Sequence, residues 1–207
     1  VATQAILFGH PELKIFEDEK TRGKTLAYLA KMIALSADLG AKATVFGSPK
    51  NRRINGLDAK KAFKSAVDFF SKIAQIAEKH QIYFCLEPNP PVYGADFILN
   101  TEEALVLIEE VIHPYLRLNL DTGILTINKE NYRSAIEKGF EFLAHLHISE
   151  PQLSLIGEKG VNHHEVAKTL KDLNYKGWVS VEMKNNLSKP NTVGVEKALS
   201  FVSRIYN

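Results

Sequence analysis

The chain has 207 residues, of which 45% are hydrophobic, and this is enough to bury the core of a globular domain. Its 26 Lys and Arg residues nearly balance its 24 Asp and Glu residues, without long runs of like charge, so nucleic acid is not an expected partner. The single cysteine, Cys85, excludes an intrachain disulfide, and no stretch reaches the about 18 apolar residues of a membrane span, so we expect a cytoplasmic protein without a membrane partner.

In chain order, short β-rich runs alternate with longer segments of helical periodicity. The predicted strands are Ala5–Gly9, Lys42–Gly47, Ile82–Glu87, Leu116–Asp121, Leu143–Ser149 and Trp178–Met183. The predicted helices are Thr21–Leu39, Asp58–His80, Thr101–Ile112, Lys129–Lys138, His163–Leu173 and Val195–Tyr206. Gly40 follows the first predicted helix, and Asp58 and Thr101 begin the second and third; such residues are common at these positions. The alternation predicts a parallel sheet built from βα units.

Two architectures are built from such units, the open doubly wound sheet and the closed (β/α)8 TIM barrel. The doubly wound fold predicts a glycine-rich phosphate loop, and the segment Phe46-Gly-Ser-Pro-Lys50 matches neither of its usual motifs. We therefore predict an α/β protein with a single TIM-barrel domain over residues 1–207. A barrel has eight strands in about 250 residues. Six visible strands predict that the first two βα units, about 30 residues each, are absent from this chain.

Four of the predicted strands end in a residue that can bind a metal ion, namely Glu87, Asp121, His147 and Glu182. The carboxyl ends of barrel strands surround one shared pocket, and the alternating faces of these strands place apolar residues toward the helices. Three carboxylates and an imidazole suit Mn²⁺, Mg²⁺ or Co²⁺, and also permit Zn²⁺. Without a cation, the carboxylates would repel each other. The pattern therefore predicts one divalent metal ion at this end of the barrel.

Each of these residues also has a structural interpretation. Asp121, followed by Thr-Gly, suits a turn or a helix cap, and a single buried histidine such as His147 is more often a hydrogen-bonded core residue than a ligand. Glu87 and Glu182 are harder to explain in this way, because a glutamate that closes an apolar strand is rarely buried unless it is paired or binds a metal. Recurrence at the same point of four successive units favours the metal site.

The order Glu, Asp, His, Glu on four consecutive strands, with His147-Ile-Ser-Glu150 and Tyr175-Lys-Gly-Trp178, resembles the xylose isomerase-like TIM-barrel superfamily of sugar-phosphate isomerases and epimerases. In that superfamily the four ligands end strands five to eight. The resemblance implies a sugar, sugar phosphate or polyol as substrate, and proton transfer at the carbon next to a carbonyl, with the metal stabilising an enediolate. In its ketose 3-epimerases, the residues that match Glu87 and Glu182 also exchange the proton, so these two are the predicted catalytic residues.

Two positions depart from the epimerase pattern. Ile124 stands where that pattern has a histidine three residues after the aspartate, and the segment 151–155 lacks the arginine that follows His-x-x-Glu. Both missing residues contact substrate oxygens in the ketose 3-epimerases. An inosose or dehydroshikimate-type dehydratase of the same superfamily is therefore an alternative.

Residues in the loops are further candidates. Arg53, or its neighbour Arg52, is a candidate to bind a phosphate or carboxylate, and His10, Glu150 and His164 are candidates to contact the substrate. Each also has a simpler interpretation, as a solvated charge, a cap or an internal hydrogen-bond partner. His145, two residues before His147, is expected to lie one layer behind the metal or to pack in the core.

Two other classes of protein share this kind of barrel. A DNA repair nuclease resembling endonuclease IV requires more histidines, including an Asp-x-His after the seventh strand, where this chain has Asn162-His163-His164. A barrel that binds a sugar without turnover is the other alternative. Because an incomplete barrel exposes sheet edges, we also expect further residues before Val1 or a partner chain, such as a second copy in a homo-oligomer.

Overall fold

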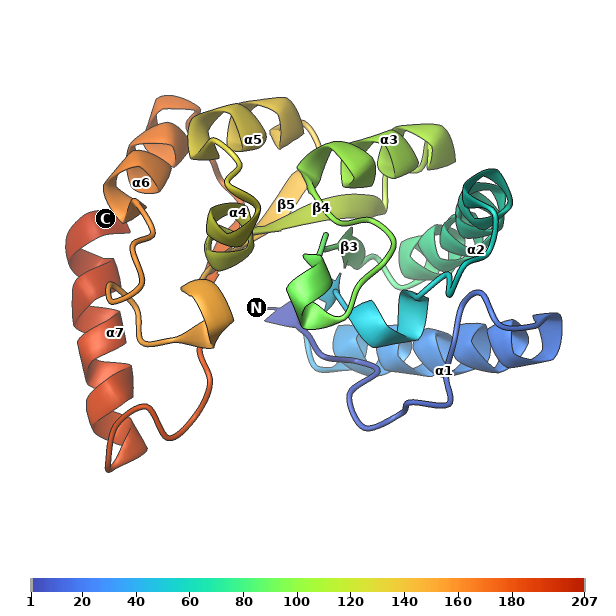
Figure 1. Ribbon diagram of the computed structural model, residues 1–207, viewed down its shortest axis with the longest axis horizontal. Coiled ribbons are helices and arrows are strands. Elements are labelled where there is room, and N and C mark those ends of the chain that lie inside the picture. The colour runs from blue at the N-terminus through green and yellow to red at the C-terminus, as the bar shows by residue number, and fades with distance from the viewer. Residues whose placement is uncertain (1, 207) are drawn as a thin grey trace. The chain divides into compact units, whose positions relative to one another are not determined.

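The computed structural model of the chain describes residues 2–206, and its strands are parallel and follow one another in chain order in the sheet (Figure 1). The strands are β1 (Ala2–Thr3), β2 (Ala43–Phe46), β3 (Tyr83–Leu86), β4 (Leu116–Asp121), β5 (Leu143–Ile148) and β6 (Trp178–Val181). The α-helices are α1 (Glu19–Asp38), α2 (Ala59–Lys79), α3 (Thr101–Val111), α4 (Thr122–Asn128), α5 (Tyr132–Gly139), α6 (His163–Asp172) and α7 (Asn191–Tyr206). The predicted α/β architecture of repeated βα units is confirmed.

The predicted strands from Lys42 onward are confirmed, and their ends differ from the prediction by two residues or fewer. The strand predicted at Ala5–Gly9 is wrong, because this segment forms a turn in which Phe8 N–H donates to the Ala5 carbonyl over 2.8 Å. Ala5 has a left-handed φ of 56°, which no strand contains. Leu7 is buried and Phe8 is exposed, so the apolar run reflects a turn that packs on one side. The first strand of the described residues is instead β1, which pairs with β2.

One helix, α4, was not predicted, and it begins directly where β4 ends. The Asp121 side chain caps it by accepting a hydrogen bond of 2.7 Å from the N–H of Ile124. The helix ends at Lys129, whose φ is 56°. The helix predicted at Lys129–Lys138 is α5. It begins three residues later than predicted, at Tyr132, and the side chain of Asn131 caps it.

The chain divides into two compact units, Val1–Asn119 and Leu120–Asn207. In the first, α2 packs against α1 and α3 (Figure 1) and buries a face of small and aromatic residues. The rings of Phe46 and Phe84 lie 5.3 Å apart, and Phe70 lies 5.8 Å from Phe46. These tilted and edge-to-face contacts between aromatic side chains join α2 to β2 and β3.

In the second unit, β5 pairs with β6 in parallel register, with His147 opposite Ser180. Helix α6 packs against α5 and α7 (Figure 1). The loop after β5 contains a short turn of helix, Pro151–Leu153, and reaches α6 at His163. Over residues 2–206, no helix combines the length and the apolar character that a membrane span requires.

Candidate metal centre

Three of the four predicted ligands converge in the second unit, where they end or follow consecutive strands. His147 Nδ1 lies 3.1 Å from Glu182 Oε2 and 3.9 Å from Asp121 Oδ2. One ligand atom from each of the three residues lies within 4.8 Å of the others. Glu182 follows β6, and its N–H continues the strand pairing by donating to the Ile148 carbonyl over 2.9 Å. The pairing of β5 with β6 therefore sets the distance between His147 and Glu182.

Asp121 has two roles at once. Its Oδ1 accepts a hydrogen bond from Ser149 Oγ over 2.6 Å and a second from the N–H of Ile124. Ser149 in turn accepts from the N–H of Gly123 over 3.1 Å. The helix-capping role expected from the Thr-Gly sequence is present. The cap orients the Asp121 carboxylate and leaves it beside His147. The contact between Ser149 and Asp121 was not predicted. The feature of the sequence that indicates it is the position of Ser149 directly after β5.

His145 lies behind His147 in the same strand. The two imidazole rings are 4.9 Å apart, and His145 Nε2 is hydrogen-bonded to Ser180 Oγ over 2.9 Å. Burial, and then the neighbouring His147, lower the pKa of His145 to about 4. His145 is therefore neutral at pH 7 and supports His147 without adding a charge.

Glu87, the remaining predicted ligand, lies in the first unit directly after β3 and is 8% exposed. Its N–H donates to the Phe46 carbonyl over 3.0 Å, which extends the pairing with β2 by one residue. Its Oε1 accepts from Asn119 Nδ2 over 2.6 Å, and its Oε2 accepts from Asn89 Nδ2 over 3.0 Å. Both amides were missed from the sequence, although Asn119 lies on the same strand face as Asp121.

Gly47 leaves the space that the Glu87 carboxylate occupies. A Cβ atom at this position would lie 2.6 Å from Glu87 Oε2 and 3.1 Å from Asn89 Oδ1. These distances are below ordinary contact, so any larger residue at position 47 must displace the carboxylate. The glycine after β2 is therefore required by the close approach of two strand ends.

The two candidate arginines have different environments. Arg52 is fully buried and donates to carbonyl groups, so it is not available to a phosphate or carboxylate ligand. Burial lowers its pKa to about 10, which still leaves it charged at neutral pH. Arg53 is half-exposed, and its Nε lies 3.6 Å from Asp96 Oδ2. Only Arg53 retains access to solvent.

His10 and His164, the two other candidate histidines, are each at least partly exposed. His10 is in the first unit, where its Nδ1 lies 3.1 Å from a Glu12 carboxylate oxygen. His164 is exposed on α6. For both residues, the predicted contact with the substrate stays a prediction.

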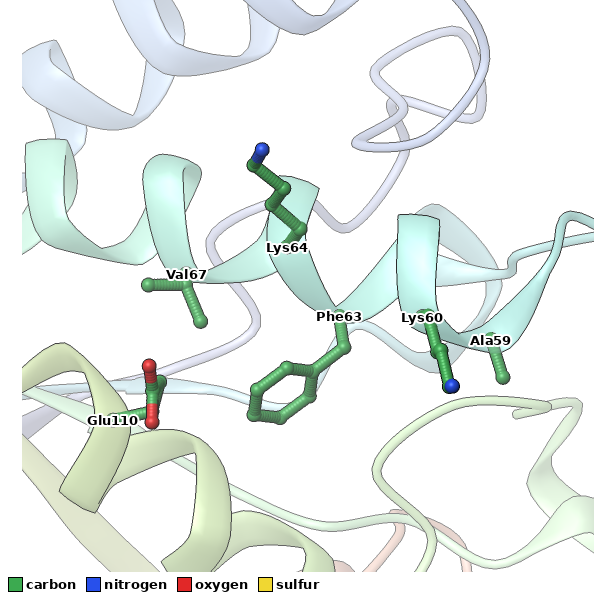
Figure 2. A pocket seen from close by; sticks show the side chains of 6 residues that line it. All are labelled: Ala59, Lys60, Phe63, Lys64, Val67 and Glu110. Carbon is green, nitrogen blue, oxygen red and sulfur yellow. The ribbon is translucent and has the colours of Figure 1, made fainter.

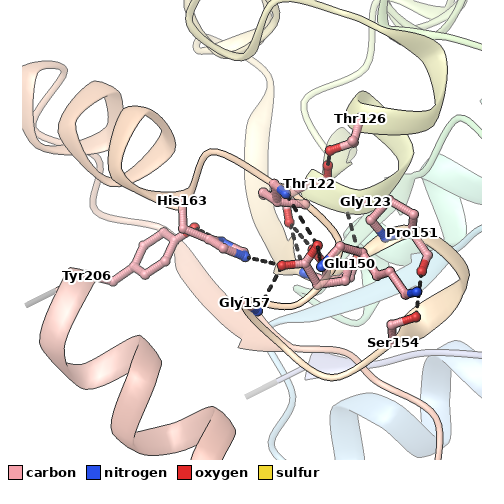
Figure 3. Close-up of polar contacts among 12 residues, drawn as sticks. Thr122, Gly123, Thr126, Glu150, Pro151, Ser154, Gly157, His163 and Tyr206 are labelled. Atoms are coloured by element: carbon pink, nitrogen blue, oxygen red, sulfur yellow. Dashed lines mark hydrogen bonds and ion pairs between the residues drawn. The ribbon is translucent and has the colours of Figure 1, made fainter.

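Glu150 has partners other than those predicted. The carboxylate is fully buried and accepts hydrogen bonds from the N–H groups of Gly157, Lys159 and Val161 over 2.8, 3.1 and 3.3 Å. His163 Nε2 also lies 3.1 Å from it, and His163 Nδ1 is 2.8 Å from Tyr206 Oη (Figure 3). Glu150 therefore organises the loop before α6, and these contacts are with that loop and His163.

A surface groove of about 540 Å³ lies elsewhere in the first unit, between α2 and α3 (Figure 2). It is lined by Ala59, Lys60, Phe63, Lys64, Val67 and Glu110. None of the predicted site residues lines it.

Comparison with known proteins agrees with this arrangement of strands. The family model described as "Xylose isomerase-like TIM barrel" matches residues 9–205. A D-psicose 3-epimerase of Enterocloster bolteae is 32% identical over 118 residues, which cover 56% of this chain and only 38% of that protein. The chain thus spans well under half the length of this curated relative.

Solved structures show the same fold. A D-psicose 3-epimerase from Clostridium cellulolyticum has a TM-score of 0.78 at 18% identity, over 95% of this chain and 76% of that one. A 3-keto-D-glucoside 4-epimerase from E. coli has a TM-score of 0.81 at 17% identity, over 99% of this chain and 78% of that one. The resemblance inferred from the order of the four strand-end residues is confirmed, and the chain belongs to the xylose isomerase-like TIM-barrel family.

Proposed function

We propose that this protein is a metal-dependent isomerase or epimerase that moves a proton at the carbon next to the carbonyl of a sugar, sugar phosphate or polyol derivative. The observation that carries this proposal is the convergence of the buried Asp121 and His147 with the partly exposed Glu182 in a chain of this family. The similarity to a D-psicose 3-epimerase supports a ketose-like substrate.

The donor atoms fit a divalent cation of intermediate hardness. Asp121 and Glu182 offer carboxylate oxygens and His147 an imidazole nitrogen, and the side chains of Asp121 and His147 are each only 2% exposed. We propose Glu87 as the fourth ligand, because it directly follows β3, whereas Asp121 is the last residue of the next strand, β4. This set suits Mn²⁺, Mg²⁺ or Co²⁺. Such an ion, when bound, polarises the carbonyl and hydroxyl oxygens of the substrate.

Glu182, the proposed catalytic residue in the cluster of the second unit, can reach a substrate because 24% of its side chain is exposed. In the proposed reaction, the Glu182 carboxylate takes the proton from the carbon, and the electrons of the broken C–H bond pass to the adjacent carbonyl. Glu87 returns a proton to the same carbon from the opposite face. The roles of the two glutamates exchange in the reverse direction.

A dehydratase of the same family is the second candidate, and Ile124 is the observation that favours it. This residue stands where ketose 3-epimerases have a substrate-contacting histidine, and its side chain is 4% exposed. A nuclease is not favoured, because His163 is already held by Glu150 and Tyr206.

The test is metal analysis of the purified protein, followed by proton exchange in deuterated water with ketoses, ketose phosphates and inositol derivatives, measured by NMR. We expect about one divalent ion per chain and deuterium incorporation next to the carbonyl of at least one substrate class. Loss of water in place of exchange would indicate the dehydratase. A protein that binds no divalent ion would contradict the proposal.

Gly47→Ala is expected to reduce proton exchange by about tenfold or more, because the new Cβ displaces the Glu87 carboxylate that the reaction uses. Glycine at position 47 has no left-handed φ, so alanine adds no backbone strain of its own. The exchange rate and the melting temperature should be measured together, with Gly23→Ala in α1 as the control. Gly23 has open space around its Cβ position. Equal rates for the two variants would contradict the role of Gly47.

A further inference from the structure

The buried side chain of Arg52 joins three separate backbone segments of the first unit. Its Nε donates to the Gly47 carbonyl over 2.7 Å, one terminal nitrogen donates to the Phe97 carbonyl and to the Ile98 carbonyl over 3.0 Å, and the other donates to the Glu87 carbonyl over 3.1 Å. This second nitrogen also donates to Asn89 Oδ1 over 3.1 Å. The five N–H groups of the guanidinium are therefore fully used within the protein.

The contact with Asn89 determines which way its amide faces. A guanidinium group only donates hydrogen bonds, so Asn89 must turn its oxygen toward Arg52. The amide nitrogen then points to the other side, where Asn89 Nδ2 donates to Glu87 Oε2 over 3.0 Å. Arg52 thus sets the orientation of an amide that holds the Glu87 carboxylate.

The second oxygen of Glu87 is held independently. Asn119 Nδ2 donates to Glu87 Oε1 over 2.6 Å. Each oxygen of a carboxylate can accept more than one hydrogen bond or ligand contact, so an amide donor does not by itself exclude a further ligand. The Asn89 and Asn119 amides therefore fix the plane of the Glu87 carboxylate.

We infer that Arg52 is a positioning residue for Glu87, acting through Asn89, and that the reaction depends on the planar fork of the guanidinium as well as on its charge. This inference rests on the proposed function, in which Glu87 transfers a proton. A 1 Å displacement of a reacting group is enough to reduce a rate by about 100-fold. Loss of a hydrogen-bond partner that orients a metal ligand also lowers metal affinity by about 10-fold to 100-fold.

Arg52→Lys keeps the positive charge but removes the fork, and Asn89→Asp keeps the acceptor for Arg52 but removes the donor to Glu87. We expect each variant to lower kcat by about 100-fold while KM changes by less than about threefold. Metal affinity, measured by titration with Mn²⁺, should fall by about 10-fold in both. Arg133→Lys, on the exposed face of α5, is the matched control and should behave as the unaltered protein.

A purely structural role for Arg52 predicts a different result. Arg52→Lys would then lower the melting temperature and the amount of active protein, whereas Asn89→Asp would keep the native kcat and Mn²⁺ affinity. That result would overturn the inference. Absence of both metal binding and exchange in the unaltered protein would instead contradict the proposed function, so the two failures are distinguishable.

Discussion

Glu182→Gln is expected to abolish measurable turnover while the protein remains folded. The glutamine has the same size, but it lacks the charge that a metal ligand needs and the basic oxygen that accepts a proton. Loss of a positioned acid or base alone reduces a rate by about 10² to 10⁴-fold. Because Glu182 lies 3.1 Å from His147, its charge is also lost from the cluster that the ion would occupy, and Mn²⁺ affinity should fall as well.

The measurements are the rate of proton exchange and a titration with Mn²⁺, each compared with Glu196→Gln. Glu196 is an exposed residue of α7, so this control makes the same chemical change away from the cluster. The control should match the unaltered protein in both measurements. A Glu182→Gln protein with native metal content and native activity would remove Glu182 from the proposed site.

The sequence was sufficient to locate Asp121, His147 and Glu182 because each follows from a local pattern. An apolar strand of period two that ends in a polar residue shows both where the strand stops and which face that residue shares. Parallel pairing then brings successive strand ends to one edge of the sheet, which is how His147 and Glu182 come within 3.1 Å. This part of the prediction needed no knowledge of distant contacts.

Local patterns failed where one short segment has two interpretations. The run from Ala5 to Phe8 is apolar enough for a strand, but a left-handed Ala5 makes it a turn. Thr122 and Gly123 suggest a loop, yet the Asp121 cap starts a helix there. The same cap shows why the departure at Ile124 leaves Asp121 in place, because the backbone N–H of Ile124 holds the carboxylate whichever side chain is present.

The roles of Arg52 and Glu150 were not accessible from the sequence for a different reason. Arg52 contacts the Ile98 carbonyl 46 residues away, and no motif around Arg52 indicates a buried guanidinium. Glu150 was predicted as a candidate to contact the substrate, but its partners lie 7 to 13 residues further along the chain, in a loop without periodicity. Both side chains orient backbone segments, and this kind of role depends on the tertiary fold.

The Glu150 carboxylate is the centre of a buried hydrogen-bond network in the second unit (Figure 3). His163 lies between Glu150 and Tyr206: its Nε2 is 3.1 Å from Glu150 Oε1, and its Nδ1 is 2.8 Å from Tyr206 Oη. Burial, and then the nearby Glu150, raise the pKa of Tyr206, which keeps its hydroxyl protonated. One side chain thereby connects the loop after β5, the start of α6 and the end of α7.

Glu150→Ala is expected to lower the free energy of unfolding by about 3 to 5 kcal/mol, because it leaves His163 and three backbone N–H groups buried without their acceptor. Glu150→Gln should also destabilise, since an amide has one acceptor oxygen and its NH₂ group would face N–H donors. Urea unfolding followed by circular dichroism measures both, with Glu158→Ala as the control from the same loop, where the glutamate is exposed. A Glu150→Ala protein that unfolds within about 0.5 kcal/mol of this control would show that the network is not required for stability.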